Sequence, residues 1–299
     1  MGSGGIDARG AWLVFGAAAV WSFGGAIARF LSVTDSWTII FWRSVCAAVF
    51  LLGFMFKRDG MRGTATLFRD MGWAGIGVGV CFATASTSFI VALSHTTVAN
   101  ILLMQAGAPL FAALLMFLLF RERVGTGTWV AIAAVMAGIT VMVSDSLDGS
   151  VSPVGDGLAL LIALAFASAT VLTRRNAHVR MMPAACLGTL ITLVAGFMFA
   201  GSLRVSAADA AWLFVFGALN LALGMMFFVT GVRLLPAAVA ALIGTAEPVL
   251  GPIWVWLVHG EVPVGRTLIG GAIVIAALLI HLAWQMRLPR QPRNVPLAD

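Results

Sequence analysis

Glu247 and Arg43 are the charged side chains best placed to do chemistry inside the long apolar segments of this chain. Glu247 is the only acidic residue deep within such a segment, and an unpaired carboxylate there is costly enough that it is expected to be neutralised, paired or functional. It could bind a substrate ammonium group or exchange a proton, it could form a structural ion pair with Arg43, or it could extend toward water. The sequence leaves these three readings open.

Three carboxamide side chains, those of Asn100, Gln105 and Asn220, also lie inside apolar segments. A polar group at that depth must find a partner, because hydrocarbon offers none. Each carboxamide has both a donor and an acceptor, so the three are predicted to bind the polar backbone of an amino acid. Hydrogen bonds between helices are the alternative.

Large or adaptable apolar side chains accompany these polar groups in the same segments. Such a lining suits an apolar substrate side chain, although lipid contact and packing are the alternatives for each member. The set comprises Trp21, Met104, Met225, Phe227, Phe228 and Trp254.

Pro109, Pro248 and His95 are predicted to take part in gating or coupling, together with Arg43 and Glu247. A proline within an apolar helix removes a backbone donor and loosens nearby carbonyl groups, which could create a hinge or no more than a packing kink. His95 lies in a polar turn, where it could act as a proton gate or be a solvated loop residue.

The elements that must position these residues are membrane-spanning helices. Of the 299 residues, 61% are hydrophobic and 10% are charged, whereas a soluble domain carries about a quarter charged residues. The segments are apolar throughout, unlike the alternating strands of a membrane barrel, so the predicted fold class is all-α membrane protein with a lipid bilayer as its surroundings. Ten transmembrane helices are expected near 11–31, 37–56, 71–93, 98–120, 128–143, 157–173, 184–201, 210–232, 236–258 and 264–286.

The net charge of +6 reflects topology and not nucleic-acid binding. With the N-terminus placed in the cytoplasm, most of the 18 basic residues fall on the internal side, which is the positive-inside bias. Both termini are then cytoplasmic.

The motifs of the common enzyme classes are absent from the sequence. There is no H-E-x-x-H and no G-x-S-x-G, and the four histidines lie on separate segments. Cys46, Cys81 and Cys186 lie in apolar segments without a pairing or metal-binding spacing. No catalytic residue, metal or cofactor is therefore predicted, and the chain is not expected to be an enzyme.

A proline followed thirteen residues later by a glutamate occurs twice, first as Pro109 with Glu122 and again as Pro248 with Glu261. The two copies are separated by 139 positions, from 109 to 248 and from 122 to 261. A repeat of five spans enters the membrane from opposite sides in its two copies, so the halves are predicted to be inverted. Inverted repeats are a recurrent construction of secondary transporters, which expose one central site alternately to each side.

This duplication predicts an organisation in five parts. They are a cytoplasmic tail at 1–10, a first five-helix repeat at 11–143, an external linker at 144–156, a second and inverted repeat at 157–286, and a cytoplasmic tail at 287–299. Since one chain holds both repeats, it is expected to work as a monomer.

The chain resembles the drug/metabolite transporter superfamily, EamA branch. The resemblance covers 11–286 and rests on ten spans in two halves, Trp21-Ser22 in the first span, Arg43 in the second, and a proline in the fourth and ninth spans followed by an acidic residue. It implies a basket of ten helices around a central cavity, formed mainly by the first, third, fourth, sixth, eighth and ninth spans.

Within that branch the chain is most similar to bacterial exporters of aromatic and other apolar amino acids. The resemblance therefore implies export of such solutes across the bacterial inner membrane by alternating access. The alternative is an exporter of cationic drugs or other metabolites, in which Glu247 could couple transport to protons.

Overall fold

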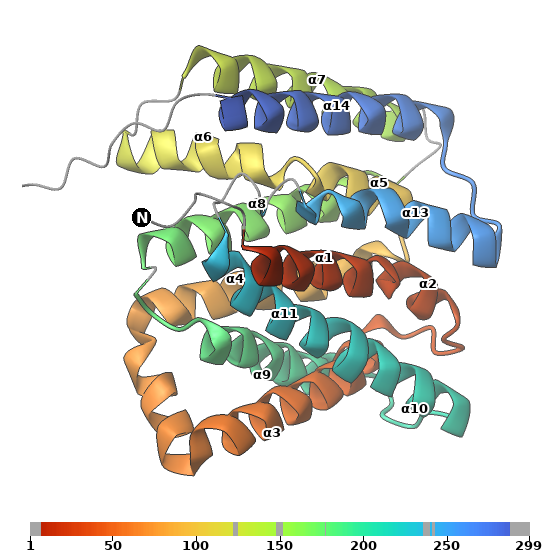
Figure 1. The fold of residues 1–299 in the computed structure, drawn as a ribbon. Helices are drawn as coiled ribbons and strands as arrows, with labels where there is room; N and C mark the ends of the chain where they lie inside the picture. The colour runs from red at the N-terminus through yellow and green to blue at the C-terminus, as the bar shows by residue number, and fades with distance from the viewer. Residues whose placement is uncertain are drawn as a thin grey trace, which may run out of the picture.

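The computed structural model describes residues 7–121, 125–147, 152–176, 178–235, 240 and 243–287, and the described chain is helical without a strand (Figure 1). The first half contains seven of the labelled helices. They are α1 (Ala8–Ser22), α2 (Gly24–Arg29), α3 (Ser36–Asp70), α4 (Gly72–Ala92), α5 (Val98–Gln105), α6 (Ala108–Phe120) and α7 (Thr126–Leu147).

The described part of the second half contains α-helices, one π-helix and one 3-10 helix. They are α8 (Pro153–Arg175), α9 (Met182–Phe199), α10 (Ala207–Phe214), the π-helix η1 (Val215–Ala222), α11 (Leu223–Gly231), the 3-10 helix η2 (Val232–Leu234), α13 (Ala246–His259) and α14 (Gly265–Arg287). Residues 236–239, 241 and 242 fall in the first part of the predicted span 236–258, and this prediction lies there outside the described residues.

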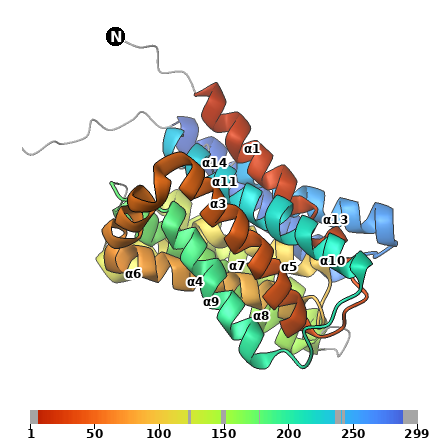
Figure 2. The same ribbon diagram turned by 90° about the horizontal axis from the view of Figure 1, so that it is seen from below.

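The long helices run side by side along the length of the molecule. Helices α4 and α8, α7 and α14, and α3 and α9 form the most extensive pairs (Figures 1 and 2). We call the end that holds the start of α1 the first end, and the end that holds the close of α13 the second end (Figure 1).

Six described helices or helix runs are long and apolar enough to cross a membrane, and one bent pair adds a seventh. Shorter apolar helices cover Thr126–Met142 and Gly265–His281. Large apolar side chains such as Trp12, Trp73, Leu118 and Ile280 are exposed on the outside, as expected for a surface that contacts lipid. The ten-span count and the inverted repeat stay predictions.

The predicted span 98–120 is two helices, because α5 ends at Gln105 and α6 begins at Ala108 with a bend of 41° between them. Pro109 lies in the first turn of α6, where its missing N–H costs nothing. Deeper in a helix it would clash with the preceding turn, so the break precedes the proline.

The basic segment between the predicted spans 37–56 and 71–93 is helical. Helix α3 continues to Asp70, with a kink at Gly60, whose φ of 71° lies in the left-handed region. Glycine adopts this conformation without strain. The part of α3 beyond Gly60 turns across the first end (Figure 1).

Candidate functional site

Interruptions of several helices surround the middle of the bundle. The α1–α2 run breaks at Phe23, the α5–α6 pair breaks at Ala106 and Gly107, and η1 widens the run from α10 to α11 into a π-helix. Backbone breaks at membrane depth are tolerated where protein or a cavity surrounds them, and π-helical turns are frequent at functional sites. These interruptions therefore mark a candidate site.

A cavity of about 60 Å³ lies among these interruptions. Its lining combines aromatic rings, one basic side chain, one acidic side chain and several neutral polar groups. The lining residues are Trp21, Gly24, Arg43, Phe82, Ala85, Ser86, Phe89, Gln105, Ile162, Phe166, Asn220, Leu221, Met225 and Glu247.

Arg43 reaches the cavity from α3. Its side chain is buried, its Nη1 donates a hydrogen bond to Ser86 Oγ at 3.1 Å, and its guanidinium lies 4.3 Å from the centre of the Phe216 ring. Its buried Nε has no hydrogen-bond partner among the described residues. A guanidinium has five N–H donors, so Arg43 keeps donor capacity for a bound solute.

Glu247 reaches the cavity from the first turn of α13. Backbone N–H groups at a helix N-terminus favour a negative charge, which gives this carboxylate local support. The structural ion pair with Arg43 is not formed: no described ion pair within 4.0 Å contains either residue. The two opposite charges instead line one cavity.

Trp21 and Asn220 fix α1 against the π-helix. Trp21 Nε1 donates to the Leu221 carbonyl at 3.4 Å, and Asn220 Nδ2 donates to the Val20 carbonyl at 2.5 Å. A Cβ on Gly224 would lie 2.2 Å from Trp21 Nε1, so the close approach of the indole requires glycine there. Both predicted residues thus line the cavity and also join helices.

Aromatic rings from α4 and α8 form another wall. Phe82 and Phe166 meet edge to face with ring centres 6.1 Å apart, and Phe89 lies two turns beyond Phe82. Ser86 shares that face of α4, as i, i+4 and i+7 spacing requires. Leu221 and Met225, which lie 139 residues after Phe82 and Ser86, line the same cavity.

The remaining predicted binding residues lie elsewhere. Asn100 is buried and donates to Asp156 Oδ1 at 2.5 Å and to Thr96 Oγ1 at 3.1 Å, which matches the alternative of bonding between helices. Met104 is fully buried in the core. Phe228 packs on Trp21, with ring centres 5.4 Å apart.

Trp254 bonds to α1, since its Nε1 donates to Ser22 Oγ at 3.0 Å. Among the gating candidates, His95 is exposed at the second end. Pro109 and Pro248 lie in the first turns of α6 and α13, close in sequence to the cavity residues Gln105 and Glu247.

Sequence reasoning did not single out the α4 and α8 lining. The missed side chains are Phe82, Ala85, Ser86, Phe89, Ile162 and Phe166, together with Gly24 and Leu221. A signal was present, because 82, 85, 86 and 89 follow helical spacing on one face and 162 and 166 do the same. The same spacing is found on faces that only pack, so it does not distinguish a cavity wall from a core.

At the second end, α2, α5 and α10 are joined to the segment that follows α13. Arg29 Nε donates to Glu261 Oε2 at 3.0 Å, and Glu261 Oε1 accepts the backbone N–H of Val98 at 3.0 Å. Phe30 stacks on Trp212 with ring centres 4.5 Å apart. These contacts hold the ends of several helices together at the second end, whereas the first end has a pocket of about 320 Å³.

The cavity of about 60 Å³ in this conformation is far smaller than small-molecule sites, which span about 300–1,000 Å³. A solute the size of an amino acid must therefore enter by movement of its walls. The described residues contain no group of three or more His, Cys, Asp and Glu side chains that could hold a metal ion. The chemistry available is hydrogen bonding, charge pairing, ring stacking and proton exchange.

Comparison with protein-family models matches the chain to the EamA-like transporter family over residues 8–144 and 153–283. A protein named riboflavin transporter from Rhizobium johnstonii is 24% identical over 84% of this chain and 82% of its own length. A second riboflavin transporter, from Vibrio cholerae, is 26% identical over 63% of each chain.

A solved crystal structure has the same fold. It covers 93% of this chain and 99% of its own, with a TM-score of 0.64 and 19% sequence identity. At that identity the likeness concerns the fold alone.

Proposed function

Because the chain belongs to the EamA-like transporter family, we propose that it carries a small aromatic solute across a bacterial inner membrane through the cavity lined by Arg43 and Glu247. The chain is a multi-pass membrane transporter and not an enzyme. Its substrate, its direction of transport and its membrane topology are proposals.

The aromatic lining of the cavity carries the proposal. Trp21, Phe82, Phe89 and Phe166 can stack on a flat ring, and Ser86, Gln105 and Asn220 can hydrogen-bond its polar edge. Among the described lining residues, Arg43 and Glu247 have formal charges that cancel, so the site as a whole suits a solute without net charge.

Riboflavin is the first substrate to test. Two relatives named riboflavin transporter align with 84% and 63% of this chain. Riboflavin is a neutral solute with a fused aromatic ring system and a hydroxylated chain. It therefore matches a cavity whose walls combine aromatic rings with neutral hydrogen-bond donors and acceptors.

Aromatic and other apolar amino acids are the second candidate. The specific observation that favours them is the presence of Arg43 and Glu247 on one cavity without an ion pair between them. A zwitterion offers a carboxylate to the first and an ammonium to the second. For these solutes we propose export.

We further propose that 11–143 and 157–286 are inverted five-helix repeats joined by an external linker at 144–156. Three observations support this: the family model matches 8–144 and 153–283, the described helices overlap the predicted spans, and lining positions of α4 and of the run from η1 to α11 share the 139-residue separation. Both termini would then be cytoplasmic, and a monomer would suffice for alternating access.

Uptake by proteoliposomes containing the purified protein tests the substrate. Riboflavin would be followed by its fluorescence, and phenylalanine, tryptophan, methionine and threonine by radiolabel, with and without a pH gradient. Saturable transport of riboflavin supports the first candidate, and saturable transport of the amino acids supports the second. If all of these solutes move no faster than into empty liposomes, the aromatic-solute proposal is wrong; a cationic dye included in the panel tests the drug-export alternative.

A further inference from the structure

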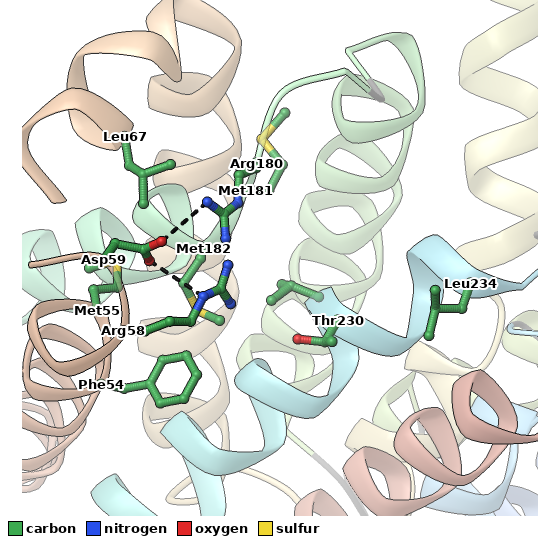
Figure 3. A pocket seen from close by; sticks show the side chains of 11 residues that line it. Phe54, Met55, Arg58, Asp59, Leu67, Arg180, Met181, Met182, Thr230 and Leu234 are labelled. Atoms are coloured by element: carbon green, nitrogen blue, oxygen red, sulfur yellow. Dashed lines mark hydrogen bonds and ion pairs between the residues drawn. The ribbon is translucent and has the colours of Figure 1, made fainter. Parts of the chain in front are cut away.

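The pocket at the first end is separate from the central cavity. Its volume of about 320 Å³ falls within the range of small-molecule sites. Its walls come from α3, from the start of α9 and from the end of α11 (Figure 3). None of the residues that line the central cavity lines this pocket.

Two arginines and one aspartate form the polar side of the pocket. Arg180 Nη1 donates to Asp59 Oδ1 at 3.3 Å, and Arg58 Nε lies 3.5 Å from Asp59 Oδ2 (Figure 3). Charge-assisted bonds are normally about 2.7–2.9 Å long, so the carboxylate holds both guanidinium groups loosely. The cluster has an excess of one positive charge.

The guanidinium groups keep most of their donors. Their side chains are 44% and 38% exposed, and Asp59 provides their only described hydrogen bond or ion pair. Each guanidinium has five N–H donors in a planar fork that matches phosphate oxygens. Two converging forks offer more donors than the two oxygens of one carboxylate can use.

The other side of the pocket is apolar and adaptable. Met55, Met181 and Met182 are buried there, and Phe54 faces Arg58 with its ring centre 5.9 Å from the guanidinium carbon. Methionine adjusts to ligands of different shape because its side chain is flexible and polarisable. This floor suits an apolar body attached to an anionic head.

The part of α3 that crosses the first end (Figure 1) contributes Leu67 to the pocket. Arg62 and Arg69 are exposed on that segment, and Met61 is 78% exposed. Basic segments with exposed apolar side chains are typical of the membrane surface, and basic pockets there bind lipid head groups.

We propose that this pocket binds a phosphate ester group carried on an apolar body, held by Arg58 and Arg180 in competition with Asp59. The ligand is either the head group of an anionic phospholipid or a free phosphorylated solute, since both present the same chemistry. The site does not depend on which solute the central cavity carries.

Titration of the full chain in a neutral detergent tests this site. The probes are dioctanoyl phosphatidylglycerol, dioctanoyl phosphatidylcholine, whose phosphate has its own ammonium, and octyl phosphate. We expect saturable binding of the first that is at least about tenfold tighter than that of the second. Competition by octyl phosphate at the same site would identify a site open to a free phosphorylated solute, and its absence would identify a lipid site.

Substitutions of the two arginines and of the aspartate should change phosphatidylglycerol binding in opposite directions. Replacing Arg58 and Arg180 together by glutamine should weaken phosphatidylglycerol binding at least about tenfold, whereas Asp59→Asn should tighten it several-fold because the internal competitor loses its charge. The matched control replaces Arg62 and Arg69, two exposed arginines outside the pocket, by glutamine, and it should change binding less than about twofold. Equal weakening by both double variants, no tightening by Asp59→Asn, or no saturable binding of either anionic probe would overturn the proposal.

Discussion

Helices α6 and α13 contain Pro109 and Pro248, the prolines of the repeated proline–glutamate spacing, which we call the signature. The two helices end alike but begin differently. Each closes in a left-handed residue one position before the signature glutamate, Arg121 with a φ of 52° and Gly260 with a φ of 67°. Each has its proline in the first turn, but the preceding residue is Ala108 in α6 and a glutamate in α13. The shared positions build a helix that restarts after a break, and the position that differs puts a charge into the cavity.

Helix α4 and the run from η1 to α11 show a similar difference at the cavity wall. Phe82 and Ser86 on α4 occupy the positions that Leu221 and Met225 occupy in the second half. One wall therefore offers a ring and a hydroxyl, and the other offers flexible aliphatic groups. Positions 139 residues apart thus line one cavity with different side chains.

The difference between Ala108 and Glu247 is expected to have the largest effect. Glu247→Gln removes the one carboxylate of the described cavity lining, and a hydrogen bond to a charged group is worth about 1.5–3 kcal/mol, so initial transport rates in proteoliposomes should fall about 10- to 100-fold. If proton exchange is part of the mechanism, the pH dependence should flatten as well. The control is Asp70→Asn at an exposed site, which should leave rates unchanged; wild-type transport by Glu247→Gln would show that the difference between the halves has no functional role.

The difference between the two signature glutamates, Glu122 and Glu261, is expected to have the next largest effect. Glu261→Gln should weaken the hydrogen bonds to Arg29 and to the Val98 N–H. A loss of about 1–2 kcal/mol corresponds to a 5- to 30-fold larger population of the state in which this contact at the second end is broken. Hydrogen exchange over residues 93–101 should accelerate by that factor. Glu122 lies outside the described residues, and Glu122→Gln serves as the matched change in the other half. Similar acceleration by both variants would contradict a specific role for Glu261 in this contact.

The two left-handed helix ends should respond in opposite directions. Gly260→Ala forces a side chain into a conformation that costs about 1–2 kcal/mol, and the added Cβ would contact nothing within 4 Å, so the loss is purely conformational. Arg121→Gly should remove a similar strain, less the entropy that glycine gains on unfolding.

Thermal unfolding in detergent measures both changes, and about 1 kcal/mol corresponds to a shift of roughly 2–4 °C. Gly53→Ala is the control, because Gly53 lies within α3 and a Cβ there also contacts nothing within 4 Å. A lower midpoint for Arg121→Gly would show that its side chain makes contacts that outweigh the strain.

The smallest predicted effect concerns the first turns of α3 and α9. Partial burial acts to raise the pKa of Asp35, but hydrogen bonds from the Thr38 hydroxyl and from the backbone N–H groups of Gly201, Trp37 and Thr38 outweigh it and lower this pKa below its ordinary value. The folded state thus favours the ionised carboxylate, and its stabilising effect is complete above about pH 4 and is lost as the pH falls through the lowered pKa.

Asp35→Ala should lower stability by about 1 kcal/mol near neutral pH, with a smaller difference from wild type in acid. The start of α9 has no side-chain cap and has a proline in its first turn instead, so Pro183→Ala should produce an effect that does not vary with pH between 3 and 7. The unfolding midpoint of each variant across this range checks both expectations. A constant deficit for Asp35→Ala would show that its charge does not matter.

Part of the site was predictable, because burial in lipid leaves few roles for a polar side chain. Arg43, Gln105, Asn220 and Glu247 were singled out on that ground, and all four line the central cavity. Asn100 satisfies the same rule in another way, since it bonds to Asp156 across a helix contact. Which polar residue faces the cavity depends on the rotation of its helix, and the sequence does not fix that rotation.

The breaks in the helices were only partly predictable. A proline indicated an interruption in the span 98–120, but its position before Pro109 follows from the requirement that proline avoid the helix interior. The π-helix at Val215–Ala222 has no comparable marker. It accompanies the close approach of Trp21 and Asn220 between α1 and η1, which is a tertiary contact.

The sequence by itself determined that this chain is a helical membrane protein of the EamA-like family, because long apolar segments can satisfy their backbone in lipid only as helices. It also determined which polar residues had to find partners. Only the tertiary structure decided that Arg43 and Glu247 line one cavity without pairing, that Glu261 bonds to Arg29 and to the Val98 N–H, and that α4 supplies an aromatic wall. These outcomes depend on helix rotation and on packing between distant segments, which no local sequence pattern specifies.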